Sequence, residues 1–260
     1  MEQRQRIILA LAGDRAAREQ LFDENIQPIY YLCWKLTGSA AQAGETTRCA
    51  FARAFSTLDE LRPEVSFDRW ITAIAVALCR QTIKTTQPGR FSTDAREPAA
   101  PESAVDEACL PRECVTDPLM RADALRAVSM LPPAQRMTVV LRYAALMQPR
   151  QIAKLMEVDE STVLGRLNCG RRALTEALPC DAPAALLPAL FAAEAAALRV
   201  PESLRSSCLH TALAPGQIDP PEETADWPQA LPEMKSAPSG KLGAVAAALV
   251  RRVGRGAARM

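Results

Sequence analysis

The sequence has little of several residue types on which common protein classes depend. Aromatic residues make up 5% of its 260 residues, and histidine occurs once, at His210. It contains no His-Glu-x-x-His pattern, no glycine-rich phosphate loop and no paired Cys-x-x-Cys motif. One histidine without a nearby nucleophile and acid leaves no arrangement to which a reaction can be assigned. We therefore expect neither an enzyme nor a bound cofactor or metal ion.

Long hydrophobic runs are also absent. The longest apolar stretch near the C-terminal end, Leu242 to Val250, is well short of the roughly 20 residues that a membrane-spanning helix needs. The first residues, Met1 to Ile8, are charged, and no hydrophobic signal segment follows them. We expect no membrane span, no export and a cytoplasmic location, in which the eight cysteines stay reduced.

What the sequence does contain favours an all-α fold. Apolar residues make up 48% of the chain, and the abundant residues Ala, Leu and Arg lose little conformational freedom in a helix. Ile29, Leu32, Cys33 and Leu36 recur at helical spacing, and Gly38 follows where such a helix would end. We predict a helix that closes there.

Two more helices are predicted in the same part of the chain. Ser39 is suited to cap the first of them, in which Phe51, Phe55 and Leu58 share one face. Ser66 is suited to cap the second. Its continuous apolar stripe consists of Phe67, Trp70, Ile71, Ile74 and Leu78. The three helices can pack into one small bundle.

Charge is distributed unevenly, although the net charge is only +1. Residues 1–90 carry 12 basic and 10 acidic side chains, residues 91–118 carry 2 and 7, and residues 119–178 carry 9 and 5. The acidic stretch is rich in Pro, Ala, Ser and Thr and cannot bury enough surface to offset the entropy of ordering it. We predict two small helical domains, 1–90 and 119–178, joined by a flexible linker, 91–118.

A Pro/Ala-rich C-terminal extension, residues 179–260, follows and is expected to be partly disordered. It contains half of the chain's 20 prolines. Ala184 to Arg199 is expected to form a helix interrupted at Pro188, and Pro201 to Leu213 a shorter one. The stretch from Pro215 to Gly240 resembles a tether.

A helix-turn-helix is predicted between Gln151 and Leu174. Pro149 suits the first turn of its first helix, and Asp159 is placed to cap the second. The apolar residues expected to face inward are Ile152, Leu155, Met156, Val163, Leu167 and Leu174. In such a layout the second helix fits the major groove of DNA. The alternative is an ordinary helical hairpin with a solvated basic face.

The wider sequence resembles a known family. Four short motifs follow one another: Leu131-Pro132-Pro133-Ala134-Gln135-Arg136, Val140-Leu141-Arg142-Tyr143, Gln151-Ile152-Ala153 and Ser161-Thr162-Val163. Together they closely resemble domain 4 of the extracytoplasmic-function (ECF) sigma factors of the sigma-70 family. Phe51-Ala52-Arg53-Ala54-Phe55 and Ser66-Phe67-Asp68-Arg69-Trp70-Ile71 resemble their domain 2. The two matches have the family's order and cover roughly residues 15–178.

The resemblance implies an RNA polymerase sigma factor that recognises promoters. Domain 2 would dock on the clamp helices of core RNA polymerase through Glu45, Arg48 and Phe51, and would open promoter DNA with a base pocket in the loop from Asp59 to Ser66. Domain 4 would bind the upstream promoter element. The expected DNA-binding residues are Arg69, Arg80, Lys84, Arg150, Ser161, Thr162, Arg166, Arg171 and Arg172. The implied partners are core RNA polymerase, promoter DNA and an anti-sigma factor.

Two other functions stay open. Where the family reads bases, this chain has Leu164, Gly165, Asn168 and Cys169, which favours a sigma-like interaction module that binds polymerase or an anti-sigma factor without reading DNA sequence. The other alternative is a thiol or metal sensor. Its candidate residues are Cys169, Cys180, Cys208 and His210.

Overall fold

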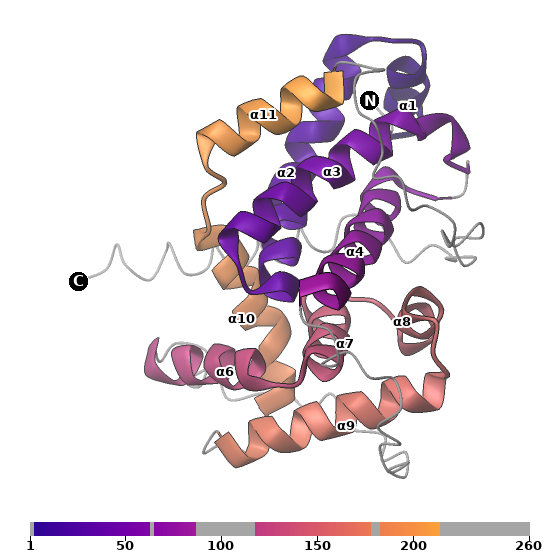
Figure 1. Ribbon diagram of the computed structural model, residues 1–260. Helices are drawn as coiled ribbons and strands as arrows, with labels where there is room; N and C mark the ends of the chain where they lie inside the picture. The colour runs from indigo at the N-terminus through magenta and orange to yellow at the C-terminus, as the bar shows by residue number, and fades with distance from the viewer. Residues whose placement is uncertain (1–2, 63–64, 87–117, 178–182, 214–260) are drawn as a thin grey trace, which may run out of the picture. The chain divides into compact units, whose positions relative to one another are not determined.

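A computed structural model describes residues 3–62, 65–86, 118–177 and 183–213 (Figure 1). Every regular element in these ranges is a helix, which confirms the predicted all-α fold. None of the helices in these ranges is long and apolar enough to cross a membrane. The predicted linker apart from Pro118 and the predicted tether from Pro215 to Gly240 lie outside the described residues, as does part of the predicted base pocket.

The contacts between helices divide the chain into two units. In its described part, unit 1 contains the first four α-helices, a short 3-10 helix and one helix from the C-terminal extension. Their bounds are α1 (Gln3–Leu11), α2 (Arg15–Thr37), α3 (Ala40–Ser56), η1 (Leu58–Glu60), α4 (Phe67–Thr86) and α11 (Glu202–Leu213). Unit 1 therefore joins segments that are far apart in the sequence.

Local signals set the ends of the helices in unit 1. Asp14 caps α2, because its Oδ1 atom accepts hydrogen bonds from the backbone N–H groups of Ala16, at 2.8 Å, and Ala17, at 3.3 Å. Gly38 ends α2 with a left-handed φ of 72° that glycine adopts without a steric penalty. The Ser39 hydroxyl accepts from the N–H of Gln42 and caps α3, as predicted.

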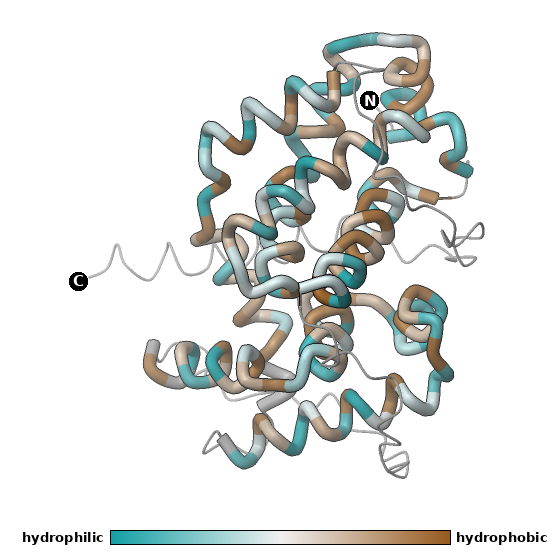
Figure 2. The backbone as a smooth tube through the Cα atoms, viewed as in Figure 1, coloured by the Kyte–Doolittle hydropathy of each residue, from teal (hydrophilic) through white to brown (hydrophobic). Residues whose placement is uncertain are grey.

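An aromatic cluster holds α2, α3 and α4 together. The rings of Phe22 and Phe51 lie 4.8 Å apart, and those of Phe55 and Phe67 lie 5.4 Å apart. Figure 2 shows that the middle of α4 is strongly apolar. Because these rings come from three helices, their burial fixes the helices of the bundle against one another.

Unit 2 surrounds one central helix, α9, in its described part. The helices are α6 (Pro118–Met130), α7 (Pro133–Tyr143), α8 (Pro149–Met156), α9 (Glu160–Ala177) and α10 (Pro183–Ala197). All of the others pack against α9. The expected interruption at Pro188 does not occur, and α10 runs through that proline. A proline removes only the hydrogen bond to the carbonyl four residues earlier, which here lies at the start of the helix.

Gly170 allows α9 to lie close to α7. A Cβ atom added at Gly170 would lie 2.6 Å from Cγ2 of Val139 and 3.7 Å from Cδ1 of Leu131. Val139 is fully buried and its β-branched side chain is stiff, so it cannot move aside cheaply. Although glycine costs a helix about 1 kcal/mol relative to alanine, the close contact requires it here.

We predict that Gly170→Ala lowers the free energy of unfolding by about 1 to 2 kcal/mol, because overpacking outweighs the gain in helix propensity. Urea unfolding of the full chain, followed by circular dichroism, measures this. Val139→Ala combined with Gly170→Ala should recover part of the loss, because it removes the clashing methyl group. The matched control is Gly44→Ala in α3, where the added Cβ meets Leu204 at an ordinary 3.6 Å. An equal loss in both single variants would contradict the packing argument.

Candidate functional site

The bihelical bend predicted from the sequence is present between α8 and α9. Helix α8 begins at Pro149 and ends at Glu157, which has a left-handed φ of 56°. The backbone N–H of Gln148 donates to the side-chain oxygen of Gln151 at 2.9 Å and so stabilises the start of α8. Helix α9 follows directly after Asp159, whose carbonyl accepts from Thr162 and Val163 at 3.0 and 3.2 Å.

The apolar residues of both helices face inward, as the sequence predicts. The buried side chains are Ile152, Leu155, Met156, Val163, Leu167 and Leu174. The Thr138 hydroxyl also donates to the sulfur of Met156 at 3.6 Å and links α7 to α8. The exposed surface of the bend is formed by what remains, chiefly the start of α9 and the polar face of α8.

Several predicted DNA-binding residues lie on that surface. Arg150 on α8 and Ser161 at the start of α9 are exposed, and Thr162 is half-buried. Near the other end of α9, Arg172 is exposed and pairs with Glu176 at 3.1 Å, while Arg171 is half-buried. Ser161 and Thr162 border the turn, where the second helix of such a motif would approach DNA, and Arg150 lies at the start of the first helix.

Arg166 does not have the exposure that a direct DNA contact needs, and the structure corrects this prediction. Only 4% of the residue is accessible, between buried Gly165 and Leu167 on α9. Arg166 follows buried Val163 by three residues and precedes buried Gly170 by four, so it lies on the inward face of α9. A cation as buried as this one needs partners within the protein, and Arg166 has such interactions. Its guanidinium therefore supports the packing of unit 2.

In unit 1, the predicted DNA-binding cations lie on α4. Arg69 and Arg80 are half-buried, and Lys84 is exposed. At 3.6 residues per turn, positions separated by 11 and 15 residues fall on nearly the same face of a helix. The three cations therefore form a line along α4.

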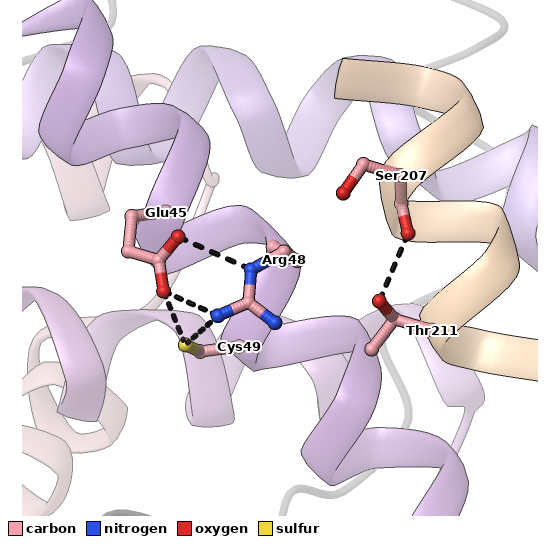
Figure 3. Close-up of polar contacts among 5 residues, drawn as sticks. All are labelled: Glu45, Arg48, Cys49, Ser207 and Thr211. Atoms are coloured by element: carbon pink, nitrogen blue, oxygen red, sulfur yellow. Dashed lines mark hydrogen bonds and ion pairs between the residues drawn. The ribbon is translucent and has the colours of Figure 1, made fainter. Parts of the chain in front are cut away.

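Glu45, Arg48 and Cys49 form a polar cluster on α3 (Figure 3). The Arg48 guanidinium donates through Nε and Nη2 to both oxygens of Glu45, with Nε 3.1 Å from Oε2, and the Cys49 thiol donates to Oε1 of Glu45 at 3.5 Å. The hydrogen bonds from Arg48 lower the pKa of Glu45 below its ordinary value. The cluster thus presents a fixed ion pair, with the Glu45 side chain 62% exposed and that of Arg48 31% exposed.

Phe51 cannot contact a partner directly, which corrects the second predicted site. It is fully buried and packs against Phe22, with its ring also 6.4 Å from that of Phe55. The residue lies one turn beyond Thr47 on the inward side of α3, where the aromatic cluster holds it. It positions the helix that carries Glu45 and Arg48.

The helix predicted from Pro201 to Leu213 is confirmed as α11, but the sequence did not predict that this helix covers part of the cluster. Helix α11 packs along α3 and α2, and its Cys208 is fully buried. Burial raises the pKa of the Cys208 thiol to about 12. The Leu204 side chain lies beside Gly44, and Arg205 pairs with Asp23 at 2.7 Å. No local signal in the sequence points to this contact, because its two sides are more than 150 residues apart.

The residues proposed for a thiol or metal sensor are not brought together in the described part of the chain. Cys169 lies on α9 in unit 2, whereas Cys208 and the exposed His210 lie on α11 in unit 1. Cys180 lies outside the described residues. Within the described ranges, no group of three or more His, Cys, Asp or Glu residues is arranged to hold a metal ion.

Comparison with known proteins matches both units. Residues 21–88 match the family model described as Sigma-70 region 2, and residues 121–174 match that of Sigma-70, region 4. The chain is 26% identical over 181 residues to the ECF RNA polymerase sigma factor SigW of Bacillus subtilis, a match that covers 67% of this chain and 96% of the relative. It is 27% identical over 169 residues to the ECF RNA polymerase sigma factor SigE of Mycolicibacterium smegmatis, covering 64% of each.

The two matched regions coincide with the structural features described above. Region 2 spans most of α2, with α3 and α4, and therefore the Glu45–Arg48 cluster and the cations of α4. Region 4 spans most of α6, with α7, α8 and most of α9, and therefore the bihelical bend. Two regions of one family, in the family's order, on helices with the expected bend, have one explanation: the chain belongs to the sigma-70 family, in its extracytoplasmic-function group.

Proposed function

We propose that this chain is a sigma factor that binds core RNA polymerase and directs it to promoters to initiate transcription. The observation that carries the proposal is the presence of both regions, 2 and 4, each as a folded helical unit. By the resemblance, region 2 would supply the polymerase contact and the opening of promoter DNA, and region 4 would supply the contact with the upstream promoter element. The anti-sigma partner expected from the sequence stays a prediction.

The polymerase contact is proposed for the surface of α3 around Glu45 and Arg48. The Glu45 carboxylate is mostly exposed and its pKa is lowered by Arg48, so it stays ionised at neutral pH. Arg48 holds that carboxylate through two hydrogen bonds and so fixes its orientation. A preoriented charge loses less conformational entropy when it meets a basic or amide-rich partner surface.

The promoter contacts are proposed for the exposed start of α9, together with α8 and α4. In a helix-turn-helix, the first helix crosses the phosphate backbone while the N-terminal residues of the second reach base edges. We assign the first role to Arg150 on α8, which is exposed, and the second to Ser161 and Thr162 at the start of α9. Arg69, Arg80 and Lys84 on α4 would follow the backbone of the opened DNA.

A second candidate is a sigma-like module that binds polymerase without reading DNA sequence. The burial of Arg166 favours it, because α9 thereby lacks an arginine that the sequence predicted for the groove. Phosphate contacts alone position a protein on DNA without specifying a sequence. The two candidates differ in whether the protein confers promoter selection on the polymerase.

Reconstitution with core RNA polymerase separates these candidates. We expect transcription on genomic DNA to begin at discrete start sites that core polymerase alone does not use, because regions 2 and 4 together would fix the polymerase on a promoter. Sequencing the 5′ ends of the transcripts measures this. Co-elution with core polymerase but an unchanged set of start sites would support the second candidate and exclude the first.

Arg150→Ala and Arg166→Ala should have opposite effects. We expect Arg150→Ala to leave stability within about 0.5 kcal/mol and to lower the salt dependence of holoenzyme binding to DNA by about one unit of slope, because it removes one phosphate contact. Arg166→Ala should instead lower the melting temperature, since it removes a buried cation from its partners. Full stability of Arg166→Ala with a loss of DNA binding would show that Arg166 does contact DNA.

A further inference from the structure

Helix α11 lies against the surface that the proposed function assigns to polymerase. The Leu204 side chain of α11 has both Cδ atoms 3.6 Å from the position of a Cβ on Gly44. Gly44 and Arg48 are four residues apart and therefore neighbours on one face of α3. Figure 3 shows the Arg48 cluster on α3 and the facing helix α11, which carries Ser207 and Thr211.

Electrostatic contacts place the middle of α11 near the same cluster. The Cys208 thiol is close enough to Arg48, Cys49 and Glu45 for their charges to influence its ionisation. Arg48 has only 31% of its side chain exposed, although it lies on the outer side of the bundle. Helix α11 is therefore part of what shields Arg48, while Glu45 lies at the margin with 62% exposed.

The attachment of α11 combines apolar burial with polar contacts. Cys208 and Ala212 are buried against the bundle. The Arg205 guanidinium lies 2.7 Å from Oδ1 of Asp23 on α2 and 5.9 Å from the centre of the Phe22 ring. The amide of Gln27 donates to the backbone carbonyl of Leu198, just before α11. The helix is thus held at several points along its length.

The two matching family models do not include this helix. The region 4 model ends at residue 174, and α11 begins at Glu202. The match to SigW covers almost all of that relative but leaves about a third of this chain unmatched. Helix α11 therefore lies outside the matched family regions, and it packs against α2 and α3 of region 2.

We infer that α11 is an intramolecular cover of the polymerase-binding surface on α3, and that it must leave this surface before core RNA polymerase binds there. The inference rests on the proposed function, because it takes core polymerase as the competitor. Helix α11 and core RNA polymerase cannot both occupy the volume above Gly44 and Arg48 at the same time. The apparent affinity for polymerase is then the intrinsic affinity reduced by the fraction of molecules in which α11 is detached.

The main experiment detaches α11 without changing α3. Leu204→Asp combined with Arg205→Glu removes the apolar contact with Gly44 and places two negative charges beside Asp23. The matched control, Ser203→Asp with Ser206→Asp and His210→Asp, alters charge by the same amount at exposed positions on the side of the same helix away from Cys208. We expect the detached variant to bind core polymerase at least about tenfold more tightly than the wild type, measured by fluorescence anisotropy. The control should match the wild type.

A second measurement needs no variant. Cys208 lies on the buried face of α11, so its thiol can be alkylated only when α11 detaches from the bundle. We expect saturating core polymerase to accelerate alkylation of Cys208 in the wild-type chain toward the rate seen in the detached variant, as followed by mass spectrometry of the Cys208 peptide. Cys79, buried in the same unit on α4, serves as the internal control and should stay protected if the bundle remains folded.

The possible results distinguish a failure of the proposal that α11 covers α3 from a failure of the sigma-factor proposal. If wild type and detached variant bind equally and Cys208 stays protected in the complex, the cover is wrong and the sigma-factor proposal stands. Weaker binding by the detached variant also overturns the cover, since α11 would then belong to the contact surface. If neither chain binds core polymerase, both proposals fail. If Cys79 is alkylated in the detached variant, the bundle of that variant is unfolded and its binding result is not used. The alkylation of Cys208 in the wild-type chain then decides whether α11 leaves α3 when polymerase binds.

Discussion

The described part of unit 2 depends on one close approach between helices. Helix α9 contacts every other helix of this unit, and it approaches α7 so closely at Gly170 that no Cβ fits beside Val139. The position of α9 in turn fixes where its first residues, Ser161 and Thr162, are presented. A small packing requirement in the middle of a helix thus controls the surface near its start, because a helix transmits displacement along its length as a rigid body.

In unit 1, a cluster of aromatic rings and helix caps, instead of a close helix contact, fix the position of the functional surface. Buried aromatic rings on α2, α3 and α4 fix the bundle, and capping groups at Asp14 and Ser39 define where α2 and α3 begin. Phe51 on the inner side of α3 and the Glu45–Arg48 pair on the outer side belong to one rigid helix. The orientation of the charged pair is therefore a consequence of the hydrophobic core beneath it.

The arginines of the chain have different roles because they differ in burial and in their partners. Arg150 is exposed and able to meet a phosphate, whereas Arg172 is exposed but pairs with Glu176 on its own helix. Arg205 joins α11 to α2, and Arg166 is buried within unit 2. Charge counted along the sequence makes these residues equivalent. Only their surroundings decide whether the cation is available to a partner.

Much of the fold was predictable, because the determining interactions are local. The end of α2 at Gly38, the cap at Ser39, the start of α8 at Pro149 and the bend before Asp159 each depend on a few adjacent residues. The apolar stripes also identified most of the buried residues. Pro188 was misjudged, since a single proline near the start of a helix removes too little hydrogen bonding to end it.

The sequence by itself therefore determined the helices, their caps, their apolar faces and the family resemblance, all of which are written in short-range patterns. Only the tertiary structure decided that Arg166 and Phe51 are buried, that Gly170 is required, and that α11 covers α3. These features arise where helices meet. The sequence spacing of residues reveals which face of a helix is apolar, but not which distant segment will pack against it.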